Sequence, residues 1–474
     1  MTLSIKGGGG IINEVPNVFD LKVTSVDRTS IEIKYKIEDV ELTICRHYLL
    51  LNGVKIEITK EAGYESSDNT FKYKINGLKK NTSYTIQILA NDGHDEGLSK
   101  AIHQTTSTDI LYSVTIDQSN SNPDSRVTYG DDAIGIQPGN STSLGGWENK
   151  WPFNQIRIVG LRNGQVEKEI KKENKKQYID GTIVQSDVDV MTEFPIIYWQ
   201  KTSSGSKITF SISDAPLEGF FPYAHQYNEQ VAEKIYIADY LSYVSSSKLR
   251  SISGIMPTTQ LSLTTIRSYA ENKGTGYCSV NINMLTMVWI LFLLSHKNTN
   301  TTMSLGTGPT TLSKEDEKIK TGSIDTKGWI YGDQTNVTKI SYLGIEDIYG
   351  TLEFWVDGMR LKNDDGIYIN LKNSNQTQIS NYTKVGTYNK FNQSYLKEID
   401  YGEKTGFFPL IPGGSDTTYY GPTYTWLQRK IEGDSFLRAG GLYYGDSGMF
   451  YFNMSFPETL TSSNLTGRLA YIKV

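Results

Sequence analysis

The stretch LGIEDIYGTLEFWVDG, at residues 343–358, is the most informative part of the chain for its fold. Gly344 and Gly350 permit tight turns, because glycine adopts backbone conformations that other residues avoid. From Leu352 to Asp357, leucine, phenylalanine and valine alternate with glutamate, tryptophan and aspartate. Alternation with a period of two is typical of a β-strand, since successive side chains point to opposite faces of a sheet. The stretch therefore predicts a strand that follows a tight turn.

Segments on both sides of this stretch complete a pattern that most of the chain shares. Before it lie residues 111–117, 126–135, 151–153, 187–195 and 250–254, and after it lie residues 436–442, 448–453 and 468–471. In this order the segments resemble lectin-like tail proteins of phages of Gram-positive bacteria. The stretch itself resembles the signature of the formylglycine-generating-enzyme-like branch of the C-type lectin fold, with Thr351 where that family usually has asparagine. The resemblance implies one large C-type-lectin-like domain, at residues 108–474, with two helices and long loop insertions.

Two segments of this large domain have the character of helices. Residues 263–274 place Ile266 and Tyr269 at helical spacing, which predicts an amphipathic helix. Residues 279–294 are expected to form the second helix. The apolar run inside it, residues 284–294, is shorter than the roughly 20 residues that span a bilayer. We therefore expect a buried core helix and no membrane insertion.

Residues 16–107 have a different pattern, with short alternating segments and many turn residues. Seven short strands in about 90 residues is the size of an immunoglobulin-like β-sandwich. Residues 75–84 resemble the tyrosine corner of fibronectin type III domains, which implies that the Tyr84 hydroxyl bonds back to nearby backbone. Residues 90–99 resemble the last hairpin of that family, whereas Tyr35 stands where the family usually has tryptophan. We expect this module to act as a spacer.

Residues 1–15 precede this module and contain four consecutive glycines, at positions 7–10. Such a run cannot hold one backbone conformation by itself. It is expected to be either a plain flexible tail or a joint to a larger particle. After the module, residues 105–108 have the composition of a linker. With 43 glycines and 31 tyrosines against 13 prolines, the chain as a whole is predicted to be a β-rich α+β protein.

Charge and cysteine content exclude several kinds of partner and chemistry. The net charge is −5, and the cationic cluster at residues 168–176 is diluted by glutamates, so no nucleic-acid partner is expected. The only cysteines are Cys45 and Cys278, which rules out a disulfide framework. The five histidines have no metal-ligand spacing, so neither a metal nor another cofactor is expected. The first residues also lack the apolar core of a secretory signal.

The lectin-like fold does not by itself fix a function, because enzymes and binding proteins share it. Formylglycine-generating enzymes need a cysteine pair near the C-terminus, and this chain has no cysteine after Cys278. Iron-dependent relatives need a histidine cluster, and calcium-dependent sugar lectins carry Glu-Pro-Asn and Trp-Asn-Asp motifs; the sequence has none of these. Asp187, Asp189 and Glu193 could serve a depolymerase as acid and base. Asp187 and Asp189 alternate with valines, however, so we expect both to face solvent from a strand.

The resemblance to diversified phage tropism determinants implies a binding face at the loops around the last strands. Tyrosine and tryptophan suit recognition, because they offer a large contact area at a small cost in side-chain entropy and keep a polar tip. They also stack on the apolar faces of sugar rings. The alternative is that these aromatic residues belong to the core or to turns. The predicted ligand-binding residues are Tyr419, Tyr420, Tyr424, Trp426, Tyr443, Tyr444 and Asp446.

These expectations converge on a non-enzymatic receptor-binding subunit of a phage tail or tail fibre. Its expected partners are a bacterial surface glycan or surface-layer protein, and other virion proteins contacted by its N-terminal region. The resemblance also implies a homotrimer, although no heptad run predicts one. Assembly into a virion in the host cytoplasm would explain the missing secretory signal. The alternatives are a structural virion component, such as a head fibre, decoration or baseplate protein, and a cell-wall or polysaccharide depolymerase.

Overall fold

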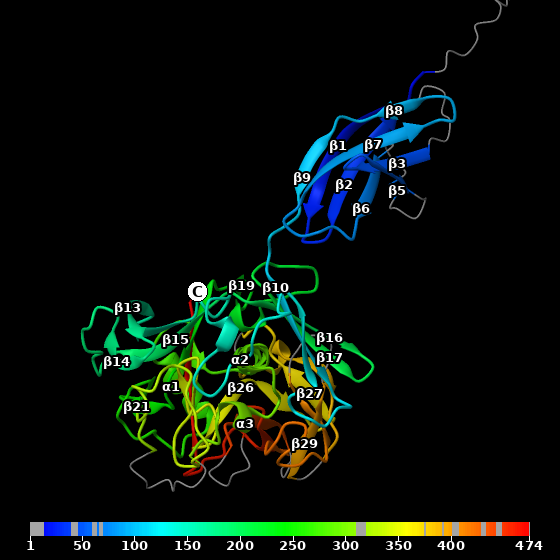
Figure 1. Ribbon diagram of the computed structural model, residues 1–474. Coiled ribbons are helices and arrows are strands. Elements are labelled where there is room, and N and C mark those ends of the chain that lie inside the picture. Colours follow the sequence, from blue (N-terminus) through cyan, green and yellow to red (C-terminus); the bar gives the residue numbers. More distant parts are fainter. Residues whose placement is uncertain are drawn as a thin grey trace, which may run out of the picture. The chain divides into compact units, whose positions relative to one another are not determined.

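The computed structural model describes residues 14–38, 46–58, 64–65, 70–309, 319–373, 376–390, 393–400, 407–427, 433–441 and 448–473. It divides the chain into two compact units, Met1–Asp109 and Ile110–Val474. Figure 1 shows the smaller unit in blue and the larger one in colours from cyan to red. The division falls two residues beyond residue 107, the end of the spacer that the sequence predicts.

The smaller unit is a sandwich of two antiparallel sheets. Its described strands are β1 (Asn17–Val26), β2 (Ile31–Glu38), β3 (Arg46–Leu51), β4 (Val54–Ile58), β5 (Tyr64–Glu65), β6 (Thr70–Ile75), β7 (Ser83–Asn91), β8 (Glu96–Leu98) and β9 (Ile102–Thr105). One sheet has the order β1-β2-β6-β5 and the other β4-β3-β7-β8, with β9 also paired with β7. Ile31, Ile33 and Tyr35 of β2 pack with Ile86 and Ile88 of β7 in one buried core. The prediction of a β-sandwich module is confirmed.

The tyrosine corner is present in this sandwich. The Tyr84 hydroxyl accepts a hydrogen bond from the Lys79 backbone N–H over 2.8 Å, and Tyr84 itself is buried at the start of β7. The hairpin expected at residues 90–99 also forms, since β7 and β8 pair antiparallel with Leu89 opposite Leu98. Both local features that residues 75–99 predict are therefore confirmed.

The larger unit contains the remaining strands and the α-helices of the described residues. Its first strands are β10 (Leu111–Asp117), β11 (Val127–Asp131), β12 (Arg157–Arg162), β13 (Gln165–Lys171), β14 (Asn174–Tyr178), β15 (Asp189–Pro195), β16 (Tyr198–Ser204), β17 (Lys207–Ser213), β18 (Gln226–Tyr227), β19 (Gln230–Val231), β20 (Lys234–Ala238), β21 (Tyr243–Ser245), β22 (Lys248–Arg250) and β23 (Tyr277–Ser279). Its later strands are β24 (Ser341–Tyr342), β25 (Ile345–Glu346), β26 (Glu353–Leu361), β27 (Gly366–Ile369), β28 (Thr383–Thr387), β29 (Ser394–Ile399), β30 (Pro409–Pro412), β31 (Tyr424–Trp426), β32 (Ser435–Ala439), β33 (Phe452–Phe456), β34 (Leu465–Thr466) and β35 (Leu469–Ile472). Its α-helices are α1 (Leu263–Glu271), α2 (Ile282–His296) and α3 (Thr301–Leu305), and its short 3-10 helices are Gly145–Trp147, Tyr223–His225 and Ile379–Asn381.

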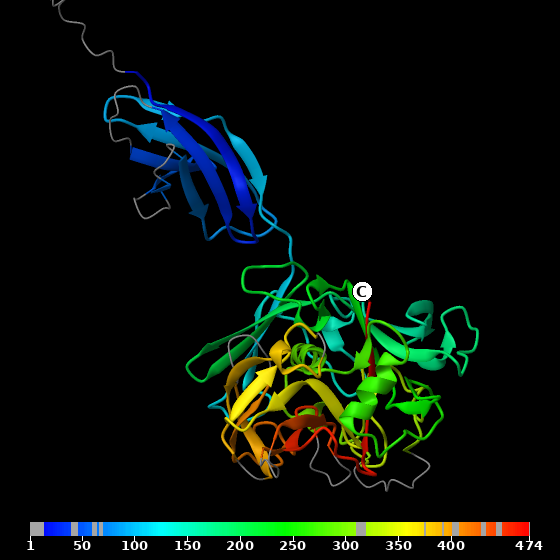
Figure 2. The ribbon, with the colours of Figure 1, turned by 180° about the vertical axis from the view of Figure 1, so that it is seen from behind.

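Two large sheets and a central helix organise this unit. One sheet has the order β14-β13-β12-β15-β20-β35-β23, and the other has the order β28-β27-β26-β32-β33-β31-β29-β30, with β34 beside β26. Helix α2 lies in the interior in both views of the molecule (Figures 1 and 2), and all 15 of its residues are buried. The expected buried core helix is confirmed. In the described residues, no helix has both the length and the apolar character that a membrane crossing requires.

Capping residues set the ends of the two longer helices. Ser262 Oγ accepts from the Thr265 N–H at the start of α1, and Asn281 Oδ1 accepts from the Met284 N–H at the start of α2. Helix α2 ends where Lys297 adopts a left-handed conformation, with φ +53°. Helix α1 begins at the predicted residue and ends three residues before the predicted end, while α2 begins three residues after its predicted start and ends two residues after its predicted end.

Strand β26 is the strand that residues 343–358 predict, but neither of its faces is exposed. All nine of its residues are buried. One face of the strand packs against the main core and the other against a second core cluster, so neither face meets solvent. Phe354 belongs to the main core, and Trp355 belongs to the second cluster together with residues of α1. The polar residues Glu353 and Asp357 are therefore buried as well, and each forms an ion pair with an arginine.

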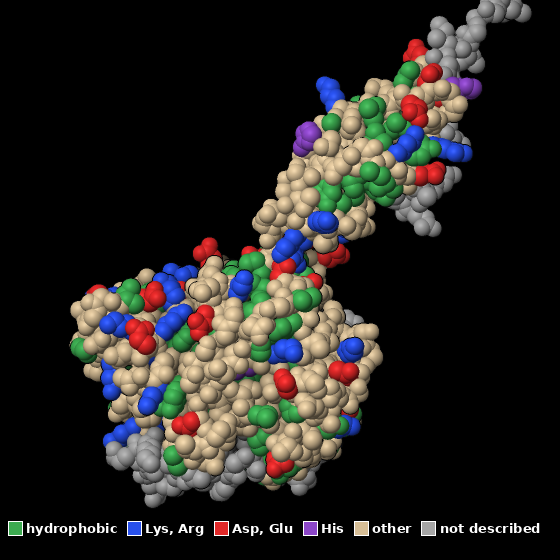
Figure 3. Space-filling model, viewed as in Figure 1, with side chains coloured by type: hydrophobic (Ala, Val, Ile, Leu, Met, Phe, Trp, Pro, Cys, Tyr) green, Lys and Arg blue, Asp and Glu red, His purple; other side chains and the backbone are tan. Residues whose placement is uncertain are grey.

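The hairpin of β13 and β14 carries the cationic cluster of residues 168–176. Charged side chains of both signs crowd over these two strands on the face that Figure 3 shows. Lys168, for example, contacts Asp180 over 2.7 Å. This agrees with the interpretation of the cluster as a solvated hairpin. Lys175 is the exception, because its buried ammonium donates to Asp239 over 3.3 Å and to the Gly344 carbonyl over 2.8 Å.

Candidate ligand-binding site

Aromatic side chains gather on two neighbouring strands of the nine-stranded sheet, β29 and β31. Tyr395 lies directly opposite Tyr424 in the pairing, and their ring centroids are 4.2 Å apart. Thr425 is fully buried, whereas Tyr424 and Trp426 on either side of it are only half-buried. Because side chains alternate along a strand, Tyr424 and Trp426 share the outer face. Three aromatic side chains thus lie on one partly exposed surface.

Tyr419 extends this surface through contacts with two cations. Its ring centroid lies 5.7 Å from the ammonium of Lys397, which follows Tyr395 by two residues on β29, and 5.1 Å from the guanidinium carbon of Arg126. Tyr419 has φ +55°, a left-handed conformation that is uncommon for a large side chain. Its N–H donates to the Ser121 carbonyl over 2.7 Å. Contacts with neighbouring residues therefore hold Tyr419 in a backbone conformation that is unfavourable for a tyrosine by itself.

Tyr420 does not belong to this surface. Its residue type and position predict a role in ligand binding, but its side chain is fully buried and packs edge-on against Phe450, with ring centroids 5.4 Å apart. Its ring centroid lies 4.9 Å from the guanidinium carbon of Arg126, which is also fully buried. Tyr419 and Tyr420 are consecutive residues of a turn, and Tyr419 is partly exposed whereas Tyr420 is fully buried. The assignment of Tyr420 to a binding face is thus corrected.

Three residues of the predicted set, Tyr419, Tyr424 and Trp426, lie together at this surface. Sequence reasoning missed Tyr395 and Lys397, because only the register between β29 and β31 places them beside the other three. The remaining predicted residues lie outside the described part of the chain, and these are Tyr443, Tyr444 and Asp446. We define the aromatic face as Tyr395, Lys397, Tyr419, Tyr424 and Trp426.

All three acidic residues that the sequence offers for catalysis form ion pairs. Asp187 is exposed and pairs with Arg162. Asp189 is buried and accepts hydrogen bonds from Arg250 Nε over 2.9 Å and from Lys273 Nζ over 2.7 Å. The expectation of solvent exposure is therefore wrong for Asp189. Its strand, β15, is an inner strand of the seven-stranded sheet and is covered on both faces, so that alternation does not bring every second side chain to water.

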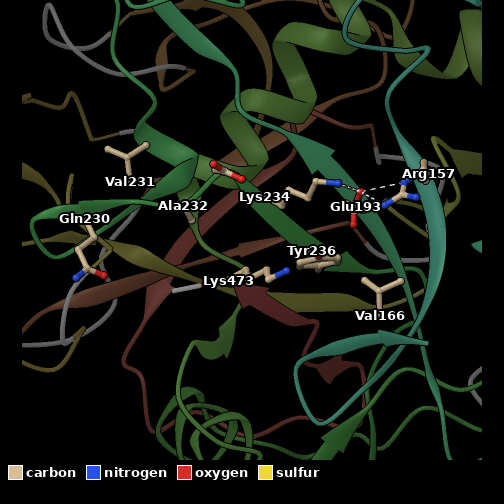
Figure 4. A pocket seen from close by; sticks show the side chains of 10 residues that line it. Arg157, Val166, Glu193, Gln230, Val231, Ala232, Lys234, Tyr236 and Lys473 are labelled. Carbon is tan, nitrogen blue, oxygen red and sulfur yellow. Dashed lines mark hydrogen bonds and ion pairs between the residues drawn. The ribbon is translucent and has the colours of Figure 1, made fainter. Parts of the chain in front are cut away.

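The third acidic residue, Glu193, lines a cavity of about 430 Å³ beside the same sheet (Figure 4). Its Oε1 accepts hydrogen bonds from Arg157 Nε over 3.0 Å, from Arg157 Nη2 over 2.6 Å and from Lys234 Nζ over 2.6 Å. Burial raises the pKa of Glu193, but the hydrogen bonds from Lys234 and Arg157 outweigh it and hold the pKa below its ordinary value. The carboxylate is therefore ionised at neutral pH, and it does not hold the proton that a general acid must donate.

Glu193 belongs to a row of side chains that crosses five strands. Along this row Arg157 lies opposite Glu193, Glu193 opposite Tyr236, Tyr236 opposite Tyr471, and Tyr471 opposite Tyr277. The ring centroids of Tyr236 and Tyr471 are 5.6 Å apart, and those of Tyr471 and Tyr277 are 4.6 Å apart. Directly opposed residues lie on one face of a sheet. The charged end of the row therefore borders the cavity, while its aromatic end packs in the second core cluster.

Among the residues that the structure describes, no group of three or more histidine, cysteine, aspartate or glutamate side chains is arranged to hold a metal ion. The aromatic face offers ring surfaces with hydroxyl and indole N–H groups, and the cavity offers fixed charges.

Comparisons with known proteins identify no family. No protein-family model and no curated protein matches the chain. A family 28 exopolygalacturonase from Yersinia enterocolitica is similar over 20% of this chain and 20% of its own, with 19% identity and a TM-score of 0.17. The fibronectin type III domain of a human fibronectin type III domain containing protein is similar over 22% of this chain and 93% of its own, with 17% identity and a TM-score of 0.14.

A chimeric titin Z1Z2 tandem is similar over 46% of this chain and 92% of its own, with 10% identity and a TM-score of 0.14. Likenesses this weak carry no argument about function. The sandwich rests on the strand pairing and on the Tyr84 hydrogen bond alone. The chain is a β-rich protein with a sandwich module and a larger unit that carries the aromatic face.

Proposed function

We propose that this chain is a non-catalytic receptor-binding subunit of a bacteriophage tail or tail fibre, and that the aromatic face holds a bacterial surface glycan or surface protein. One observation carries the proposal. Tyr395, Tyr424 and Trp426 lie partly exposed on two paired strands of one sheet, with Tyr395 directly opposite Tyr424. In this proposal the larger unit is a C-type-lectin-like frame, and the smaller unit is a spacer toward the virion.

The physical properties of the aromatic face suit a polymer made of sugars. Tyrosine and tryptophan rings stack on the apolar faces of sugar rings, while their hydroxyl and N–H groups bond to sugar hydroxyls. Side chains on strands are held more precisely than side chains on loops. Arg126 supports the face from beneath, because its buried guanidinium contacts the Tyr419 ring. Little conformational entropy is lost when a face that is already ordered binds its ligand.

The acidic residues favour binding over hydrolysis. A depolymerase needs a protonated carboxyl as general acid, whose pKa is usually raised. Glu193 has the opposite property, because Lys234 and Arg157 hold its pKa below the ordinary value. Asp189 is engaged by Arg250 and Lys273. The surroundings of Glu193 and Asp189 therefore support ligand binding without bond cleavage better than hydrolysis.

Weak binding by one aromatic face becomes firm when several copies act together. Linked sites bind with an effective concentration that raises the overall affinity by about 10²–10⁴-fold without any new contact. We therefore include a homotrimer in the proposal. In a virion the N-terminal region would join this trimer to other structural proteins, and the subunit would be assembled in the host cytoplasm.

A sedimentation assay with purified host cell walls tests the proposal. The wild-type chain is expected to sediment with the walls and to release no reducing ends from them. Trp426→Ala and Tyr424→Ala should reduce the bound fraction, whereas Tyr243→Ala, which changes a half-buried tyrosine on β21, should not. Release of reducing ends would overturn the non-catalytic assignment. Full wall binding by both Trp426→Ala and Tyr424→Ala would overturn the role of the aromatic face. In a separate experiment, immunogold labelling of the capsid instead of the tail would favour a structural virion component.

A further inference from the structure

The cavity beside Glu193 lies at a different place in the larger unit from the aromatic face. Figures 1 and 2 place β29 and the end of the unit that contains β19 far apart along the vertical direction, which the rotation between the two views preserves. Gln230 and Val231 of β19 line the cavity. A ligand in this cavity would therefore be bound independently of the aromatic face.

The size and the rim of the cavity fit one sugar-sized group. Its volume of about 430 Å³ lies within the range of about 300–1,000 Å³ that small-molecule sites occupy. Val166 and Val231 stand at the rim with exposed fractions of 36% and 45%, although they are apolar. Exposed apolar side chains next to charged groups provide a contact for the carbon face of a ring and leave the polar groups to fix its orientation.

The charges of the cavity favour an anion. Arg157, Lys234 and Lys473 line it together with Glu193 and Glu233. The only described acceptor for the Lys234 ammonium is Glu193, and an ammonium has three N–H donors. Glu193 Oε1 accepts from three N–H groups of Arg157 and Lys234, so these two cations offset the charge of Glu193. The lining thus presents unused donors from cationic groups.

Lys473 is the most available of these cations. Its side chain is exposed, and among the described residues no ion pair involves it. Its backbone N–H donates to the Lys234 carbonyl over 3.3 Å, which places it next to β20. Figure 4 shows the Lys473 ammonium extending toward Tyr236 at the cavity. A carboxylate or phosphate in the cavity would meet Lys473 and the free N–H groups of Lys234.

We propose that this cavity is a second binding site, which takes a single sugar residue that carries an oxyanion, such as a carboxylate or a phosphate. The oxyanion bonds to Lys473 and Lys234, the sugar hydroxyls face Glu193 and Tyr236, and the carbon face of the ring rests on Val166 and Val231. The site would let the protein distinguish charged from neutral surface polymers at a place separate from the aromatic face.

Titration calorimetry on the full chain with glucuronate, glucose 1-phosphate and glucose tests this proposal. Both anionic sugars are expected to bind and glucose is not, and the difference between the two anions identifies the source of the oxyanion. Lys473→Gln should weaken anion binding roughly tenfold, the loss expected for one charge-assisted hydrogen bond. Lys207→Gln, which removes an exposed lysine from β17 in a different sheet, is the matched control and should have no effect.

Three outcomes would overturn the proposal: equal binding of glucose, unchanged affinity in Lys473→Gln, or an equal loss in Lys207→Gln, which would indicate general attraction to surface charge. Lys473→Gln keeps the assay interpretable because an exposed side chain can be replaced without disturbing the core, and a thermal melt confirms that the variant is folded. Trp426→Ala should bind the anionic sugars normally. The test therefore separates this site from the function proposed for the aromatic face.

Discussion

Arg438 and Glu353 form a buried ion pair between β32 and β26, in which Arg438 Nη1 donates to Glu353 Oε2 over 2.7 Å. The other carboxylate oxygen, Oε1, accepts from the Tyr451 hydroxyl over 2.8 Å and from Asn453 Nδ2 over 3.1 Å. The network joins β26 to β32 and to the start of β33. Because all four side chains are buried, each polar group depends on the others for its hydrogen bonds.

Glu353→Ala should destabilise the larger unit by about 3–5 kcal/mol, because it leaves the Arg438 guanidinium buried without a counter-charge. Chemical denaturation followed by tryptophan fluorescence measures the loss. Asp187→Ala is the matched control, since it removes an aspartate whose ion pair with Arg162 is exposed and should change stability little. Similar losses in the two variants would show that the buried network has no special role.

Tyr84→Phe should destabilise the smaller unit by about 1 kcal/mol, because the Lys79 N–H loses its hydrogen-bond acceptor. The transition of the larger unit should not move. Tyr48→Phe, which changes a half-buried tyrosine on β3, serves as the control. Hydrogen exchange offers a direct readout, since the Lys79 amide should lose protection in Tyr84→Phe alone. Unchanged exchange at Lys79 would contradict the role of the tyrosine corner.

His296 should make the larger unit less stable in mild acid. Burial lowers the pKa of His296 to about 4, so the folded state resists a proton that the unfolded state takes up near pH 6.5. Its contribution to stability is complete above pH 6.5 and is lost as the pH falls from 6.5 toward 4. At pH 5 the loss amounts to about 2 kcal/mol relative to pH 7.5.

His296→Gln isolates this effect, because glutamine does not titrate and can still donate to the Asn140 carbonyl that His296 Nε2 contacts. The drop in stability between pH 7.5 and 5 should shrink in this variant. The comparison with wild type is needed because Asp239 has the opposite effect on stability. Burial raises the pKa of Asp239 to about 6, so its contribution to stability is present at low pH and is lost as the pH rises through 6. An unchanged drop in His296→Gln would contradict the assignment.

Trp426→Ala should weaken binding to host walls at least tenfold, because a stacked ring contributes a large contact area to recognition. Binding curves with wall fragments measure the change. Arg126→Met should have a smaller effect in the same direction, since it removes the cation beneath Tyr419 without changing an exposed group. Thermal melts separate a loss of binding from a loss of folding. A larger effect of Arg126→Met on binding than of Trp426→Ala in folded protein would argue against the aromatic face as the contact surface.

Local elements of this chain are readable from its sequence. The alternation from Leu352 to Asp357 predicts a strand, and β26 begins at Glu353 within it. The apolar run at residues 284–294 predicts a buried helix, and α2 contains it. The Tyr84 hydrogen bond follows from one short motif. In each case the residues that determine the structure lie within a few positions of one another, so that their pattern is visible along the chain.

Relationships between distant segments are not readable in the same way. The alternation around Asp189 predicts solvent exposure, but distant strands cover both faces of β15 and bury this carboxylate. Tyr395 joins the aromatic face only through its register with Tyr424. Tyr420 is buried because the turn that contains it directs its ring toward Phe450. Composition identifies which residue types suit a binding face, whereas tertiary packing decides which individual residues reach it.

Strand β35 lies between β20 and β23, so the seven-stranded sheet receives one of its inner strands from residues 469–472. A ribosome that has not yet released these residues holds a nascent chain in which β20 and β23 have unpaired edges. The sandwich closes within residues 17–105 and can form early during translation. The larger unit can complete its seven-stranded sheet only after residues 469–472 are synthesised. Until then the unpaired edges of β20 and β23 can aggregate or bind chaperones of the cell that makes the protein.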